Sequence, residues 1–134
     1  MIQEEYITLE TAKLAKEKGF NELVDTLYKD GIFKFNTSHT LSKFPQSISN
    51  NGLSDKCFSA PTKYILERWL RERHNVNIAV YPTMSYYRNV ETTKYAFTRF
   101  HKAVAKFHSD ITYETHDEAF EAALQNALNY IEKE

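Results

Sequence analysis

The sequence predicts an α+β fold, in which a small antiparallel sheet of two to four strands packs against two helices. Apolar residues recur at helical spacing in two segments, residues 60–74 and 116–132. Apolar and polar residues alternate, as in half-buried strands, in residues 76–81 and 94–101. About ten residues separate these two predicted strands, and so short a connection favours antiparallel pairing.

The chain has the length and composition of a single domain over residues 1–134. Nine Tyr, nine Phe and one Trp can supply a sizeable core. Its one cysteine, Cys57, excludes an intramolecular disulfide. The first ten residues are acidic where a secretory signal needs a basic flank, and no segment reaches the roughly 20 apolar residues of a membrane span. We therefore expect a cytoplasmic protein with no membrane partner.

The net charge of −1 conceals an uneven distribution of charge along the chain. Residues 56–108 contain ten Lys or Arg and three acids, net +7, whereas residues 109–134 contain one Lys and seven acids, net −6. Two interpretations stay open. Either the two segments attract each other within one domain, or the basic segment forms a face for an anionic partner.

A short first helix is predicted over about residues 9–18. Thr8 is placed to cap its first turn, and Gly19 is placed to end it in a left-handed conformation. Its apolar residues spread around much of the helical wheel, so this helix is only weakly amphipathic.

The segment after this helix permits two structures. Asn21 could cap a second helix that runs through Tyr28, or the chain could be extended, and alternation favours a short strand near Ile32–Phe35. Residues 36–57 are rich in Ser, Thr and Asn without any periodicity, which predicts a long polar loop. Loops of this length are often functional.

The helix predicted over about residues 60–74 begins at residues 59–61, because Pro61 suits a first helical turn. On a helical wheel, one side forms an apolar stripe of Ile65, Leu66, Trp69 and Leu70. The opposite side carries Tyr64, Arg68 and Arg71 at the spacing i, i+4, i+7. This pattern therefore predicts a helix with one face in the core and one basic face toward solvent.

The strand over residues 76–81 should end at Pro82 or lie at a sheet edge, since proline cannot donate to a neighbouring strand. Residues 84–93 are predicted to connect this strand to the next one. In the strand over residues 94–101, Tyr95, Phe97 and Arg99 share one face. Residues 103–113 fit a third strand, although part of this segment could also be helical.

The last helix, over about residues 116–132, has the clearest pattern. Thr115 and Glu118 have the spacing of a capping box. One broad apolar stripe contains Ala119, Phe120, Ala123, Leu124, Ala127, Leu128 and Ile131. Polar residues occupy the other face, so this helix should cover the sheet.

Three stretches carry a family resemblance: TLETAKLAKEKGF, APTKYILERWLRERHNVNI and THDEAFEAALQNALNYI. Together they make up about half of the chain, and in this order the sequence resembles small uncharacterised phage- or prophage-type proteins of gut bacteria of the Bacteroidetes. The resemblance implies an α+β domain and a phage or mobile-element setting in a bacterial host cell. It implies no catalytic residues, and residues 36–56 lie outside it.

No constellation in the sequence predicts catalysis, a metal site or a cofactor. The five histidines, His39, His74, His101, His108 and His116, lack the close spacing of a metal-binding motif. Cys57 lies before a predicted helix, but no partner base can be identified. No glycine-rich phosphate loop is present. The sequence therefore leans against an enzyme, with a cryptic site in residues 36–57 kept as an alternative.

The most suggestive surface combines cations with aromatic rings. The candidate binding residues are Tyr64, Arg68, Arg71, Arg88 and Arg99. Such a mixture is typical of nucleic-acid surfaces, yet it also fits ordinary solvated charges beside a buried aromatic core. We expect a non-catalytic accessory protein that binds a host or phage macromolecule, with a protein partner favoured over nucleic acid. Homo-oligomerisation stays open.

Overall fold

The structure is a computed structural model, and it describes residues 5–37 and 47–132, apart from the side chains of residues 85–87. It confirms the α+β class. The sequence predicted one small sheet, and the structure has two three-stranded antiparallel sheets. By its internal contacts the chain forms two compact units: unit 1, Met1–Leu66 with Ile131–Glu134, and unit 2, Glu67–Tyr130. A single domain over residues 1–134 stays a prediction.

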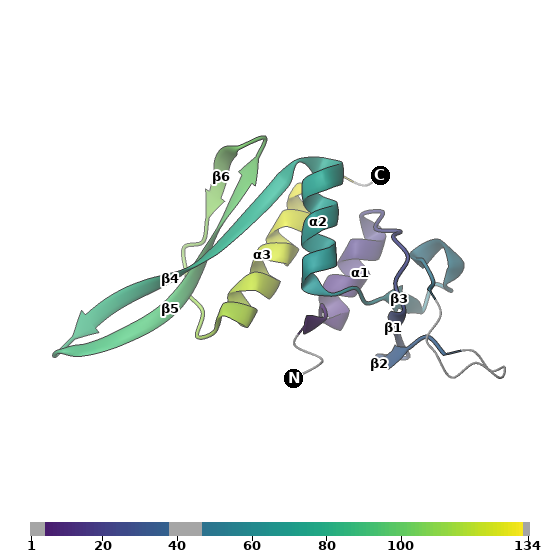
Figure 1. Cartoon of the computed structure of the whole chain (residues 1–134), viewed down its shortest axis with the longest axis horizontal. Coiled ribbons are helices and arrows are strands. Elements are labelled where there is room, and N and C mark those ends of the chain that lie inside the picture. Colours follow the sequence, from purple (N-terminus) through teal and green to yellow (C-terminus); the bar gives the residue numbers. More distant parts are fainter. Residues whose placement is uncertain (1–4, 38–46, 133–134) are drawn as a thin grey trace. The chain divides into compact units, whose positions relative to one another are not determined.

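In unit 1, helix α1 (Leu9–Glu17) matches the predicted helix to within one residue (Figure 1). The Thr8 hydroxyl caps it by accepting a hydrogen bond of 3.4 Å from the backbone N–H of Thr11. Gly19 follows the helix with a φ of 99°, which only glycine adopts without strain. Ala12 and Ala15 are fully buried, so the face that they share lies in the core of this unit.

The first sheet consists of β1 (Thr26–Lys29), β2 (Ile32–Phe35) and β3 (Cys57–Ser59), in the order β2-β1-β3. The strand predicted near residues 32–35 is confirmed. For the preceding segment, the sequence allowed either a helix through Tyr28 or an extended chain, and the structure has the extended chain. Asp30 and Gly31 connect β1 to β2 with φ of 54° and 78°, as in the type I′ turn that suits a two-residue hairpin.

Helix α2 (Lys63–His74) begins later than the sequence predicted. The predicted start at residues 59–61 is wrong, because Ser59 ends strand β3 and pairs with Leu27 of β1. The cap comes instead from Thr62, whose hydroxyl accepts a hydrogen bond of 3.2 Å from the backbone N–H of Ile65.

The predicted apolar stripe of α2 is buried at Leu66, Trp69 and Leu70, and half-buried at Ile65. Asn75 follows the helix with a φ of 56°, a left-handed conformation that asparagine tolerates better than most residues. It therefore ends α2 where the sequence predicted and turns the chain into the next strand.

The predicted polar loop is confirmed in part, and residues 38–46 lie outside the described residues. Asn50–Gly52 form a 3₁₀ helix, η2. The side chain of Asn50 is buried: its Nδ2 donates to the carbonyl of Phe20 at 2.7 Å, and its Oδ1 accepts from the N–H of Ser59 at 2.9 Å. These bonds hold the end of the loop against the rest of unit 1.

In unit 2 the sheet follows the chain order: β4 (Val76–Tyr87), β5 (Val90–His101) and β6 (Val104–His108). The third strand predicted within residues 103–113 is confirmed. The connection predicted at residues 84–93 is wrong, because these residues continue β4 and β5 as a two-stranded ribbon (Figure 1). The ribbon ends in a two-residue turn at Arg88 and Asn89, with φ of 51° and 66°.

Pro82 lies within β4, opposite Tyr95 of β5. The backbone of Tyr95 exchanges two hydrogen bonds of 2.8 Å with Tyr113, on the side away from β4. The backbone of Pro82 therefore points outward from the edge of the sheet, where no donor is needed. Of the two effects predicted for this proline, the edge position is the one observed.

Helix α3 (His116–Tyr130) packs against β4 and β5 and ends two residues before the predicted boundary (Figure 1). The Thr115 hydroxyl accepts a hydrogen bond of 3.1 Å from the N–H of Glu118, as predicted for the cap. The predicted apolar stripe is buried at Ala119, Phe120, Ala123, Leu124, Ala127, Leu128 and Ile131. Packing of a sheet against the helix at residues 60–74 stays a prediction.

The turn between β5 and β6 contains a substitution site that should stabilise unit 2. Ala103 has a φ of 67°, in the left-handed region that disfavours a Cβ atom by about 1–2 kcal/mol. Ala103→Gly should raise the free energy of unfolding by about 0.5–1 kcal/mol after the greater flexibility of glycine in the unfolded chain is subtracted. Urea denaturation measures the change. Ala105→Gly, within β6, is the control and should be destabilising.

Candidate functional site

A surface cleft in unit 2 is the clearest candidate site. Its volume is about 440 Å³, and it is lined by residues of β5 and β6, of the chain before α3, and of α3 itself. The residues that line it are Phe97, Phe107, Ser109, Asp110, Ile111, Tyr113, Ala122, Gln125, Asn126 and Asn129. This volume is in the range of small-ligand pockets, so the cleft is large enough to hold one side chain of a bound molecule and the groups next to it.

Aromatic rings form one wall of the cleft. Phe97 is 3% exposed, and its ring stacks on that of Phe107 with centroids 5.7 Å apart. The ring of Tyr113 lies 6.2 Å from Phe97 and is tilted by 32°. Because Phe97 is packed from both sides, these rings form a preorganised apolar surface that needs little reordering to bind a partner.

A short loop forms the rim, and β5 holds both of its ends. The N–H of Ser109 donates to the carbonyl of Phe97 at 2.9 Å, and the N–H of Phe97 donates to the Ser109 hydroxyl at 3.1 Å. Four residues later, Tyr113 pairs with Tyr95. Between these anchors, Ile111 is 62% exposed and Asp110 is also exposed. The loop thus presents an aliphatic and an acidic side chain at the entrance.

The wall on α3 consists of a small residue and three amides. Ala122, Gln125, Asn126 and Asn129 are spaced i, i+3, i+4, i+7, so they share one side of the helix. Asn126 Oδ1 accepts a hydrogen bond from the guanidinium of Arg99. Side-chain amides both donate and accept, so the exposed amide of Asn129 can pair with the N–H and C=O groups of a peptide.

Arg99, one of the predicted binding residues, is held inside unit 2. Its guanidinium carbon lies 4.0 Å from the ring centroid of Tyr130 and 5.4 Å from that of Phe107. Burial lowers the pKa of this guanidinium, although the Tyr130 hydroxyl acts in the opposite direction. The Arg99 side chain joins β5 to α3. Its hydrogen bond holds the side chain of Asn126 in the wall of the cleft.

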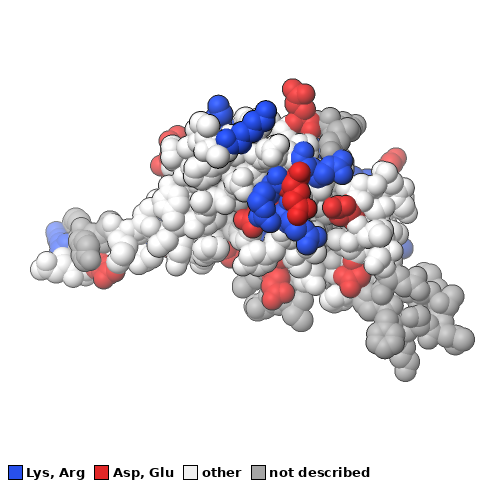
Figure 2. All heavy atoms as spheres, turned by 45° about the horizontal axis from the view of Figure 1, so that its top comes forward, with Lys and Arg blue, Asp and Glu red and all other residues white. Residues whose placement is uncertain are grey.

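The other predicted binding residues lie at exposed positions of the chain. Tyr64 is 66% exposed, and Arg68 and Arg71 are also exposed, as predicted for the outer side of α2. Arg88 lies in the turn at the end of the ribbon. Nine residues of β5 separate that turn from Arg99, which corresponds to about 30 Å. On the face that Figure 2 draws, Asp and Glu side chains lie among the Lys and Arg side chains.

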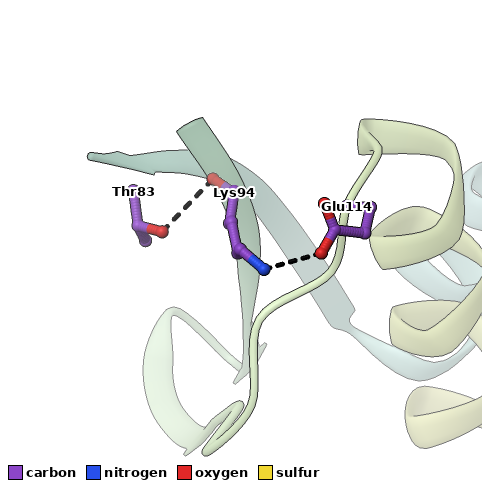
Figure 3. A network of polar contacts seen from close by, with 3 residues as sticks. All are labelled: Thr83, Lys94 and Glu114. Carbon is purple, nitrogen blue, oxygen red and sulfur yellow. Dashed lines mark hydrogen bonds and ion pairs between the residues drawn. The ribbon is translucent and has the colours of Figure 1, made fainter. Parts of the chain in front are cut away.

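Lys94, at the base of the ribbon, is occupied by an ion pair (Figure 3). Its Nζ lies 2.6 Å from Glu114 Oε1, and its backbone carbonyl accepts a hydrogen bond of 3.2 Å from the Thr83 hydroxyl. The pair ties the ribbon to the chain before α3. Both side chains are exposed, so its contribution to stability is small, at most about 1 kcal/mol.

Glu67 on α2 gives the unfolding free energy a dependence on pH. Burial raises the pKa of its carboxyl above the ordinary value, and the attraction of Arg71 only partly opposes this. The ionised carboxyl therefore destabilises the fold at neutral pH, and this penalty disappears as the pH falls below the pKa of the unfolded chain. Glu67→Gln should raise the urea midpoint at pH 7 and leave it unchanged near pH ~3. An equal gain at both pH values would contradict this cause.

The described residues contain no group of side chains that could hold a metal ion. No three His, Cys, Asp or Glu side chains within residues 5–37 and 47–132 gather as a metal site would require. His101 and His108 bond through Nδ1 to the hydroxyls of Tyr130 and Thr98, at 2.8 and 2.9 Å. Thr98 is 4% exposed in mid-strand, where a substrate carbon cannot reach its hydroxyl.

Comparisons of the chain with protein-family models, curated protein sequences and solved structures find no match. The resemblance to phage-type proteins therefore stays a prediction.

None of the described helices combines the length and the apolar character needed to cross a membrane. Of the rings that line the cleft, sequence reasoning singled out Phe97, and it missed the loop at residues 109–113 because this loop has no periodic pattern to place it.

Proposed function

We propose that this chain is a non-catalytic accessory protein that holds a segment of a partner polypeptide in the cleft of unit 2. A phage or mobile element is the proposed source, and the bacterial cytoplasm the proposed location. One observation carries the proposal: the cleft combines a preorganised aromatic wall with a row of side-chain amides. Apolar anchors beside peptide-like hydrogen-bonding groups are what a polypeptide segment requires.

The dimensions of the amide wall support a polypeptide partner. Seven residues separate Ala122 from Asn129, so this side of α3 is about 10 Å long. Three residues of an extended peptide have the same length. At the rim, Ile111 offers an aliphatic side chain that is 62% exposed, as residues at the edge of a protein interface often are.

Affinity capture with a cleft-filling variant tests this function. Ala122→Trp places a large ring in the cleft, whereas Ala79→Trp places the same ring on an exposed position of β4 that does not line it. Tagged, nuclease-treated wild-type and Ala79→Trp proteins should retain the same partner from infected or lysogenic cells. Ala122→Trp should lose it while keeping the wild-type melting temperature. Retention by Ala122→Trp would place the binding site elsewhere.

A nucleic-acid-binding protein is the second candidate, favoured by the exposed cations Arg68 and Arg71 on α2. If it is correct, affinity for an oligonucleotide should fall steeply with salt, and reversing the charge at these two positions should weaken binding. The neighbouring acids Glu67 and Glu72 reduce the local positive charge. An enzyme with a cryptic site in residues 36–57 stays a further alternative, and residues 38–46 of that segment lie outside the described residues.

A further inference from the structure

We propose that the cleft selects a basic polypeptide segment and takes a Lys or Arg side chain against its aromatic wall. This inference rests on the proposed function, since it names the chemistry of the partner for the same site. Three observations lead to it: the charge of the cleft lining, the charge of the surrounding chain, and the aromatic character of one wall.

The residues that line the cleft include one carboxylate, Asp110, and no Lys, Arg or His. The surrounding chain has the same sign: residues 109–130 contain no Lys or Arg and five acids, of which Glu114 is paired with Lys94 and the others are Asp110, Asp117, Glu118 and Glu121. Glu118 is exposed four residues before Ala122, so it extends the side of α3 that forms the cleft wall by one turn. A cationic segment is attracted to this surface, and an anionic one is repelled.

The aromatic wall suits a cation as well as an apolar group. Ring faces carry partial negative charge and attract Lys and Arg side chains within about 6 Å of the centroid. Arg99 already makes this contact with Phe107, at 5.4 Å. Because Arg99 repels a second cation, we place the incoming side chain at the other end of the cleft, beside Asp110 and Tyr113. There its charged group can meet the carboxylate while its methylenes cover the rings.

Three matched peptides test the selection by charge. The probe is the heptapeptide Gly-Leu-Lys-Ser-Lys-Leu-Gly, with control versions in which both Lys are Gln or both are Glu. Each is titrated into the full-length, ¹⁵N-labelled chain, and amide shifts report both affinity and position. The Lys peptide should bind about tenfold more tightly than the Gln peptide, with shifts confined to residues 107–113 and 122–129. The Glu peptide should not bind.

Two conservative variants test the role of the carboxylates. Asp110→Asn and Glu118→Gln should each weaken the Lys peptide about threefold, as surface charge pairs do, and leave the Gln peptide unchanged. Equal affinity for the Lys and Gln peptides, or tightest binding of the Glu peptide, would overturn the charge selection and leave the proposed function standing. If none of the peptides shifted the cleft residues, or if a single-stranded oligonucleotide did, both proposals would be overturned.

Discussion

Phe97→Ala should lower the free energy of unfolding by about 3–5 kcal/mol, the largest effect that we expect from one substitution in unit 2. Phe97 is 3% exposed in the middle of β5, and its ring contacts those of Phe107 and Tyr113. Removing the ring leaves a cavity between Phe107 and Tyr113, and the loss of its buried contacts adds to the cost. Urea denaturation followed by the fluorescence of Trp69, which is buried in the same unit, measures the loss.

The matched control is Val90→Ala, which also removes apolar atoms from β5. Val90 is 62% exposed, so this variant should change the free energy of unfolding by less than about 0.5 kcal/mol. A loss below about 1 kcal/mol for Phe97→Ala would mean that α3 does not cover this part of the sheet.

Arg99→Ala should lower the free energy of unfolding by about 2–3 kcal/mol. The substitution removes a hydrogen bond to Asn126 and two ring contacts, with Tyr130 at 4.0 Å and Phe107 at 5.4 Å. Partly buried contacts of these kinds contribute about 1 kcal/mol each, and they do not add fully because they share one guanidinium. Arg99, which the sequence predicted as a binding residue, is therefore also a structural residue of unit 2.

Two further variants separate this structural role from an effect of charge alone. Arg68→Ala removes an exposed arginine from α2 and should change stability by less than about 0.5 kcal/mol. Arg99→Lys keeps the charge but loses the planar fork and should recover only part of the loss. Full recovery by lysine would show that the positive charge suffices, and an equal loss for Arg68→Ala would contradict the assignment.

Sequence patterns predicted the helices well, because their signals are local. The caps at Thr8 and Thr115 and the stripe from Ala119 to Ile131 are visible in single segments, and the structure bears them out. The first sheet is harder to predict because its strands have only three or four residues each, too few for alternation to show. The strand at residues 57–59 was therefore missed, and Ser59, its last residue, was predicted to start a helix.

The long ribbon of unit 2 was missed for a different reason. Sequence reasoning expects glycine or asparagine-glycine in a two-residue hairpin turn, and this turn consists of Arg88 and Asn89. Only asparagine in this pair suits a left-handed conformation. Residues 84–93 consequently resembled a connection, although their backbone pairing continues without a break to the turn.

The cleft and the position of Arg99 could not be predicted from alternation alone. Alternation correctly placed Arg99 on the same face as Tyr95 and Phe97, but it does not say which face of a sheet a helix covers. The covered face is the one that contains Arg99, so a residue expected at the surface became part of the support of the cleft. The cleft itself joins three segments that lie apart in the sequence.

Photo-crosslinking in the host cell tests the central claim most directly. The crosslinker p-benzoylphenylalanine, placed at Gln125, lies in the wall of the cleft, and at Arg68 it lies on the exposed side of α2. We predict that Gln125 captures one discrete protein, joined through a segment rich in Lys or Arg, and that Arg68 captures none. Capture at Arg68 alone, or capture of nucleic acid at either position, would contradict a polypeptide-binding cleft in unit 2.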